Sequence, residues 1–263
     1  MNQDFDVREH NRRAWDKNVD NANQWSVAVD AETIEAARNG DWKVVLTPIK
    51  PIPRDWLSAE LTGVDILCLA SGGGQQGPVL AAAGGNVTVF DNSPRQLAQD
   101  RRVAEREGLT ITTVEGDMRD LSAFPDCVFD VIVHPVANVF VPNVLNVWRE
   151  AYRVLRPNGV LLSGFCNPVT YLFQNDDVES VSDLRVTHRI PYSDIDSLTD
   201  DEKALWIAES RELAFGHTLD DQIGGQIAAG FAITGFFEDR NFGGLLAEYL
   251  PTFIATRALK VAK

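Results

Sequence analysis

A glycine-rich turn follows a predicted buried strand in this sequence. The turn Ala70-Ser71-Gly72-Gly73-Gly74-Gln75-Gln76-Gly77 lies between the strand Val64–Leu69 and the helix Pro78–Ala83. Glycines let a backbone approach a ligand closely, and the first turn of a helix offers unpaired N–H groups. In a doubly wound sheet, ligands bind outside the carboxyl ends of the strands, where this turn would lie. We therefore expect a ligand to contact Ala70, Ser71, Gly72, Gly74 and Gln76.

Acidic residues follow the next two predicted strands. Asp91, with Asn92 beside it, comes directly after the strand Val87–Phe90. A carboxylate at that position can accept hydrogen bonds from both hydroxyls of a ribose. Asp117 follows the third strand, where it could accept from an exocyclic amine while Met118 covers an adenine face. The alternative for each acid is an ordinary charge in a loop or beside a helix. Together with the glycine turn, Asp91, Asn92, Asp117 and Met118 predict a site for an adenosine-containing cofactor.

Strands and helices alternate around these residues. Ser93-Pro94 is a strong helix start, and that helix is predicted to run to Glu107 and to end at Gly108. Residues 142–155 predict an amphipathic helix. The predicted strands are Val64–Leu69, Val87–Phe90, Thr110–Val114, Val131–Val133, Val160–Phe165, Phe231–Phe237 and Phe253–Leu259. Alternation of this kind favours right-handed βαβ units. The expected fold class is α/β, with a doubly wound, mostly parallel seven-stranded sheet.

The last two predicted strands have no helix-forming segment between them, so we expect an antiparallel pair at one edge of the sheet. An insertion at about 166–217 separates them from the fifth strand and is predicted to hold one strand near Leu184–Ile190. Thr218 is then expected to cap a helix that continues through Ala229. The insertion contains Tyr171, Phe173 and Tyr192. These rings fit an apolar ligand or simple core packing equally well.

A helical extension precedes the sheet. Asp30 is expected to cap a helix that ends near Arg38, and the three prolines of Thr47–Pro53 predict a stiff, extended connector. We therefore divide the chain into residues 1–55, a helical segment with its connector, and residues 56–263, the cofactor-binding domain.

Residues 62–168 resemble the class I S-adenosylmethionine-dependent methyltransferases, in particular the small-molecule group that includes quinone methyltransferases. The resemblance rests on the glycine turn, Asp91 and Asp117 in their order along the chain. It implies S-adenosylmethionine as cofactor, S-adenosylhomocysteine as product and a small-molecule methyl acceptor. The family commonly carries an acid two residues before its first glycine. Cys68 and Ala70 occupy the corresponding positions here and depart from that pattern.

The same resemblance places the segment after the fourth strand beside the methyl group that is transferred. His134 is therefore a candidate general base, or alternatively a residue that lines the cofactor pocket, and Asn138 is a weaker candidate. Related enzymes often fold an N-terminal helix across the cofactor. In this chain Trp15 and Trp25 could close the pocket and exclude water, or could pack onto the sheet.

Two other functions fit parts of the pattern. Gly72, Gly74 and Gly77 have the spacing of a dinucleotide-binding fingerprint, which would suit an NAD(P)-dependent oxidoreductase. No Tyr-x-x-x-Lys pair occurs in the sequence, which argues against the short-chain dehydrogenase version. A non-catalytic regulator that binds S-adenosylmethionine is the second alternative, because a fold does not fix an activity.

Composition limits the partners. The chain has 263 residues and a formal net charge of −14 at pH 7, so nucleic acid and anionic membranes are poor candidates. The polar N-terminus has no signal-peptide pattern, which favours a cytoplasmic location. Cys68, Cys127 and Cys166 have neither disulfide nor zinc-site spacing and are expected to pack as small apolar residues. No metal site is predicted, and the acceptor and the oligomeric state stay open.

Overall fold

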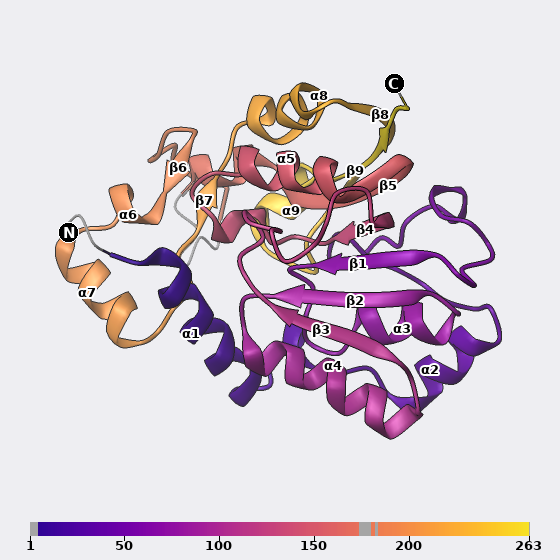
Figure 1. Ribbon diagram of the computed structural model, residues 1–263. Coiled ribbons are helices and arrows are strands. Elements are labelled where there is room, and N and C mark those ends of the chain that lie inside the picture. Colours follow the sequence, from indigo (N-terminus) through magenta and orange to yellow (C-terminus); the bar gives the residue numbers. More distant parts are fainter. Residues whose placement is uncertain (1–4, 174–179, 182–183, 263) are drawn as a thin grey trace.

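The computed structural model describes residues 5–173, 180–181 and 184–262, and a seven-stranded sheet forms its centre (Figure 1). In chain order its strands are β1 (Asp65–Leu69), β2 (Asn86–Asp91), β3 (Ile111–Glu115), β4 (Phe129–His134), β5 (Leu155–Cys166), β8 (Phe231–Asp239) and β9 (Phe253–Lys260). They lie in the order β3-β2-β1-β4-β5-β9-β8. β1 to β5 are parallel, and β9 is antiparallel to both β5 and β8. The predicted fold class is confirmed.

The strand order reverses between β1 and β4. β2 and β3 extend the sheet on one side of β1, whereas β5, β9 and β8 extend it on the other. The connections after β1 and β4 therefore leave the sheet in opposite directions, and a crevice opens at their carboxyl ends. This topology brings the glycine-rich turn and the segment after β4 to the same edge.

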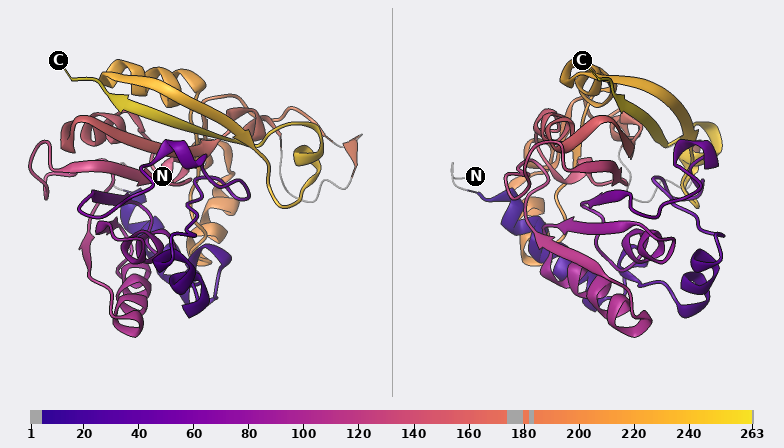
Figure 2. Two further views of the ribbon diagram at one scale, coloured as in Figure 1. Left: turned by 90° about the vertical axis from the view of Figure 1, so that its right-hand side faces the viewer. Right: turned by 45° about the vertical axis from the view of Figure 1, so that its right-hand side comes forward.

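Helices cover both faces of the sheet. The helices that cover them are α1 (Val7–Asp20), α2 (Ala31–Arg38), α3 (Gln76–Ala82), α4 (Pro94–Glu107), α5 (Leu145–Val154) and α8 (Gly225–Ala229). α2, α3 and α4 lie on one face with α1 packed against α4, whereas α5 and α8 lie together on the other (Figures 1 and 2). One apolar cluster includes Leu80, Val89 and Leu97, and a second includes Trp148 and Leu161. The sheet thus separates two cores, as expected for a doubly wound fold.

Several helix ends follow the predicted capping residues. The Ser93 hydroxyl accepts a hydrogen bond from the Gln96 N–H at the start of α4, and Gly108 ends that helix in the left-handed conformation. Asp30 caps α2 in the same way through the Thr33 N–H. These caps satisfy backbone groups that a helix end leaves unpaired, which is why the sequence could locate both helices accurately.

The connector after α2 crosses the carboxyl half of the sheet. The carbonyl oxygen of Leu46 would lie only 2.0 Å from a Cβ atom at Gly164 of β5, so the close crossing requires a glycine there. The carboxylate of Asp239, at the end of β8, accepts from the Thr47 hydroxyl and from the Ile49 and Lys50 N–H groups at 2.7–3.0 Å. The prediction of an extended connector is wrong, because residues 46–49 bend and Val45 forms an antiparallel bridge to Pro51. The folded-back connector is fixed to β8 by the Asp239 bonds. The division at residue 55 stays a prediction.

The insertion differs from its predicted structure. Its described elements are η4 (Pro168–Leu172), β6 (Tyr192–Ser193), α6 (Asp194–Ser197), α7 (Asp200–Ala208) and β7 (Phe215–Gly216). The strand predicted near Leu184–Ile190 is wrong, because only Val186 forms a bridge there, to Phe173. Strand pairing occurs instead between β6 and β7. Pairs as short as this depend on tertiary contacts, which local sequence patterns do not encode.

Three further expectations need correction. The segment after Thr218 is not a uniform α-helix, because a π-helical turn, η6 (Asp220–Gly224), precedes α8. The β8–β9 connection contains a helix, α9 (Leu245–Tyr249). Cys127 is exposed in a turn with positive φ rather than packed in a core, whereas Cys68 is buried as predicted.

In the part of the chain that the structure describes, no helix is long and apolar enough to cross a bilayer.

Candidate active site

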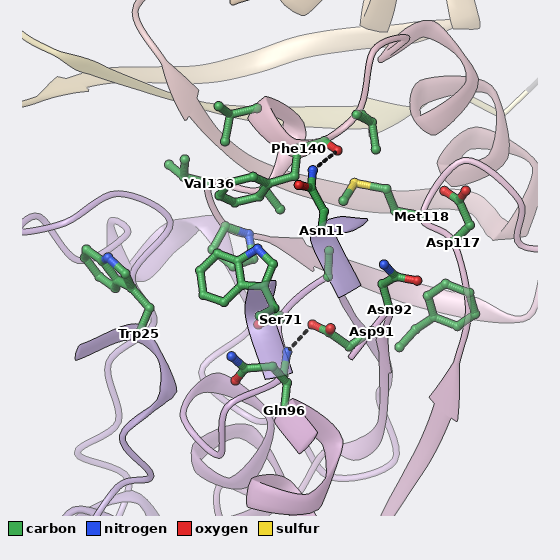
Figure 3. A pocket seen from close by; sticks show the side chains of 18 of the residues that line it. Asn11, Trp25, Ser71, Asp91, Asn92, Gln96, Asp117, Met118, Val136 and Phe140 are labelled. Carbon is green, nitrogen blue, oxygen red and sulfur yellow. Dashed lines mark hydrogen bonds between the residues drawn. The ribbon is translucent and has the colours of Figure 1, made fainter. Parts of the chain in front are cut away.

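A cavity of about 330 Å³ opens at the carboxyl edge of the sheet, beside the glycine-rich turn (Figure 3). Its lining combines α1, the connector, the ends of β1 to β3 and the segment after β4. The predicted cofactor residues that line it are Ala70, Ser71, Gly72, Gln76, Asp91, Asn92, Asp117 and Met118. Gly74 and His134 are not part of this lining. The structure therefore brings eight of the predicted residues to one cavity and places the other two outside its lining.

The glycine turn takes a conformation that few residues tolerate. Ala70, Gly73 and Gly74 have φ values of +48°, +113° and +73°. A Cβ atom at Gly74 would lie 2.9 Å from the Cβ of Ala28, in the segment between η1 (Gln24–Ser26) and α2. Gly74 therefore permits close packing beneath the turn and does not contact the cavity.

Asp91 lies across the turn from β1, at the end of β2. Its two carboxylate oxygens accept hydrogen bonds from the Gly72 and Ser93 N–H groups, both at 2.9 Å. Burial raises the pKa of Asp91, although these N–H groups oppose the rise. Asp91 lines the cavity, its carboxylate is fixed by these bonds, and a carboxylate oxygen can accept more than one hydrogen bond. Asp91 can therefore accept from a pair of ligand hydroxyls without first moving.

Asp117 has a partner that the sequence reasoning missed. Its carboxylate receives hydrogen bonds from the Arg119 guanidinium, the shortest at 2.6 Å, and from the Arg119 N–H. Burial acts to raise the pKa of Asp117, but the bonds from Arg119 outweigh it and lower the pKa. The pair keeps Asp117 ionised as an acceptor, and Met118 lies beside it (Figure 3). An arginine two residues after an acid was the only available signal.

Helix α1 closes one side of the cavity. The Asn11 amide donates to the carbonyl oxygens of Phe140 and Leu213 and accepts from the Leu213 N–H, at 2.8–3.1 Å. Asn11 is buried and lies over the site (Figure 3). The Asp16 carboxylate accepts from the Ser93 hydroxyl at the start of α4. These bonds join α1 to three separate parts of the chain, so the helix is a docked cover.

The remaining wall is apolar. Trp15 packs edge-on against Phe140 with 5.1 Å between ring centres, and Trp25 lies on the side opposite Asp117 (Figure 3). Further apolar lining comes from Val45, Leu46, Pro48, Val136, Val139, Val141 and Phe253. The sequence left two roles for Tyr171 and Tyr192, contact with an apolar ligand or core packing. Their rings stack on each other with 5.3 Å between centres, and neither lines this cavity.

His134 is buried behind the cavity wall. Its Nδ1 lies 2.8 Å from the Leu69 carbonyl oxygen, and its Nε2 lies 2.6 Å from the Asn138 side chain. Burial lowers the pKa of His134, and neither His134 nor Asn138 has exposed surface. Since both ring nitrogens are engaged and the ring does not line the cavity, the geometry does not support a general-base role or pocket lining.

The charged groups of the cavity gather on one side. They are Arg8, Asp91, Asp117 and Arg119, and the Arg8 guanidinium donates to Asn92 at 3.0 Å. The only other ionisable lining residue in the described chain is Cys166, whose pKa burial raises to about 11. Within residues 5–173, 180–181 and 184–262, no three His, Cys, Asp or Glu side chains are grouped to hold a metal ion. The polar side suits a nucleoside, and the apolar side suits an uncharged molecule.

Known proteins are similar to this chain in sequence. A family model described as a methyltransferase domain matches residues 67–163. The chain is 56% identical over 252 residues to the uncharacterized methyltransferase YbaJ of Bacillus subtilis (strain 168), a match that covers 96% of this chain and 98% of that protein. It is 31% identical over 136 residues to a ubiquinone biosynthesis O-methyltransferase of Actinobacillus pleuropneumoniae serotype 7, covering 49% of this chain and 58% of that enzyme.

Solved structures share the fold. An S-adenosylmethionine-dependent methyltransferase from Mesorhizobium loti matches with a TM-score of 0.60 and 22% identity, covering 78% of this chain and 94% of that one. At this identity the match shows a shared fold, and the Bacillus subtilis relative shows the family. The chain belongs to the class I S-adenosylmethionine-dependent methyltransferases. Membership in this family removes the NAD(P)-dependent oxidoreductase alternative.

Proposed function

We propose that this cavity binds the adenosine part of S-adenosylmethionine on its charged side. Asp91 would accept from the two ribose hydroxyls, and Asp117 with Met118 would hold the adenine. Only glycine fits beside the Asp91 carboxylate at position 72, because a Cβ atom there would lie 3.0 Å from that carboxylate and 2.7 Å from Gln96. Ala70, Ser71 and Gln76 would line the remaining cofactor surface. The observation that carries this proposal is the fixed Asp91 carboxylate beside Gly72.

The acceptor is proposed to be a small, largely apolar molecule. When bound, S-adenosylmethionine supplies an electrophilic methyl group, and transfer needs the acceptor atom held in line with the methyl–sulfur bond. Trp15, Trp25 and Phe140 would orient the acceptor and exclude water. No His, Lys, Glu or Tyr of the described chain lines the cavity. The acceptor's own pKa would therefore decide whether a base is needed, and the lining side chains that could accept a proton are Asp91, Asp117 and Cys166.

The ubiquinone biosynthesis relative gives the acceptor class some support, because a quinone precursor is a small molecule with an apolar ring. The net charge of −14 also disfavours a nucleic-acid acceptor. A cytoplasmic location remains a prediction.

Calorimetric titration with S-adenosylhomocysteine, and separately with NAD and NADP, tests the cofactor assignment. We expect a Kd on the order of micromolar, about −8 kcal/mol, for S-adenosylhomocysteine alone. Binding of a nicotinamide nucleotide alone would refute it. Consumption of S-adenosylmethionine with apolar phenols, thiols and amines then separates an enzyme from a regulator that only binds the cofactor.

A further inference from the structure

Asp100 is a fully buried carboxyl group that the proposed function does not use. It lies on α4 with no exposed surface and does not line the cavity. Its Oδ2 accepts a hydrogen bond from the Gly73 N–H at 3.0 Å, and its Oδ1 has no hydrogen-bond partner in the described chain. Burial, with the like charge of Asp91 nearby, raises the pKa of Asp100 to about 8. Burying such a group is unfavourable, so its placement against the Gly73 and Gly74 N–H groups of the turn needs an explanation.

The turn is held from below by α4. The Gly73 N–H lies 3.1 Å from the Gln96 carbonyl oxygen as well as 3.0 Å from Asp100. On the other side, a Cβ atom at Gly73 would lie 2.7 Å from the Trp25 carbonyl oxygen. Gly73 is therefore enclosed between α4 and η1, which contains Trp25. Asp100 is the side chain that fixes the direction of the Gly73 N–H.

The sequence carries no acid where this family commonly has one. Cys68, on β1, is buried and close enough to Asp100 for the carboxylate charge to raise its pKa further, beyond the main effect of burial. Cys68 on β1 and Asp100 on α4 are both buried, and the charge of one acts on the other. A carboxyl group introduced at Cys68 would therefore enter this buried region from β1 instead of from α4.

We propose that Asp100 is a positioning residue for the cofactor: from α4 it holds the turn in the conformation that presents Gly72 and Asp91 to the cavity, a task that no acid on β1 performs in this chain. The inference rests on the proposed cofactor site. Gly72 is bonded directly to Gly73, so the orientation of Gly73 affects that of Gly72. The Gly72 N–H in turn donates to Asp91. Loss of the Asp100 bond would therefore disturb the ribose acceptor through the turn.

Three variants test the proposal by calorimetry with S-adenosylhomocysteine. Asp100→Val removes the acceptor and should weaken binding at least about tenfold, the equivalent of one lost hydrogen bond. Asp100→Asn keeps an uncharged acceptor and should stay within about threefold of wild type near pH 7. The exchange Cys68→Asp with Asp100→Cys returns a carboxyl group from β1 and should recover most of the lost affinity.

Val103→Ala is the matched control. Val103 is buried on the same helix, three residues after Asp100. Its side chain has no polar group that could bond to the glycine-rich turn. It should lower stability without changing affinity. A folded Asp100→Val protein with wild-type affinity would overturn the proposal and leave the cofactor site intact. If wild type itself binds no S-adenosylhomocysteine, the proposed function fails instead.

Amide exchange provides a readout without any cofactor and without a variant. In the wild-type protein the Gly73 amide should exchange at least about tenfold more slowly than that of Gly243, which is exposed in the β8–β9 connection. Fast exchange at Gly73 would show that Asp100 does not hold it, whatever the variants do.

Discussion

Asp91 is the side chain on which cofactor affinity should depend most directly. Asp91→Ala removes a charged acceptor from two ribose hydroxyls in a covered cavity, and should weaken S-adenosylhomocysteine binding by about 2–4 kcal/mol. Calorimetry measures the change. Asp120→Ala, at an exposed residue outside this cavity, is the control and should bind like wild type. Unchanged affinity in a folded Asp91→Ala protein would exclude the ribose assignment.

His134 should matter for stability rather than for chemistry. His134→Ala deletes a ring without exposed surface and two hydrogen bonds, and should lower the free energy of unfolding by about 2–4 kcal/mol. Denaturant unfolding measures this loss. The pH dependence of methyl transfer by the folded variant should match that of wild type. A selective loss of rate with normal stability would restore the general-base hypothesis.

The sequence predicted those site residues whose location depends only on their position at the end of a strand. Asp91 and Asp117 each follow a strand of a parallel sheet, and such strands end at one edge, so their neighbourhood was predictable. Arg119 and Asp100 were not found, because their roles depend on side-chain direction. His134 follows a strand in the same way, yet its ring turns into the core, which residue order cannot show.

Among the elements, α1 lines one side of the cavity, and we expect it to control access. Asn11→Ala would leave the Leu213 N–H and two carbonyl oxygens without partners, at about 1–3 kcal/mol for each buried unpaired group. We expect faster amide exchange in residues 7–20 and 211–217, and faster release of S-adenosylhomocysteine in stopped-flow measurements. Arg13→Ala changes an exposed surface pair on the same helix and should alter neither. Equal release rates for both variants would mean that α1 is not a cover.

Elements with local signals were predictable and elements without them were not. α4 has a serine cap, a proline in its first turn and a terminal glycine, and its predicted ends agree with the structure. β6 and β7 have two residues each and exist through their pairing with one another. The π-helical turn before α8 had no sequence signal either, because its start still looks like a capped α-helix.

For the whole molecule, Asp239 joins the connector that precedes the sheet to the C-terminal strand β8. Its pKa is lowered because hydrogen bonds from Lys50, Thr47, Ile49 and Arg240 together outweigh burial. A carboxyl group with a lowered pKa stabilises the fold at pH values above its pKa in the unfolded chain, which is about 3.9. This contribution is lost as the pH falls through the pKa of the folded state. Asp239→Asn places an NH2 group against N–H donors. It should reduce the free energy of unfolding by about 1.5–3 kcal/mol at pH 7, and by less near pH 3.

Urea unfolding at both pH values measures the effect, with Asp196→Asn, at an exposed carboxylate, as control. A loss that stays the same at pH 3 and pH 7 would mean that the ionised form of Asp239 contributes nothing. The sequence could not have predicted this link, because Thr47 and Asp239 are 192 positions apart.

The crossing of Leu46 over Gly164, together with the Asp239 link, has a consequence for synthesis on the ribosome. Domains generally fold as units while the chain emerges, beginning at the N-terminus. Here the connector, which is made early, completes its contacts only when β5 and β8 are present, and Phe253 of β9 lines the cavity. A nascent chain that lacks β9 would therefore have most of its nucleotide-facing residues but an unfinished cavity. Such a chain should not capture the methyl donor until the last strand has left the exit tunnel.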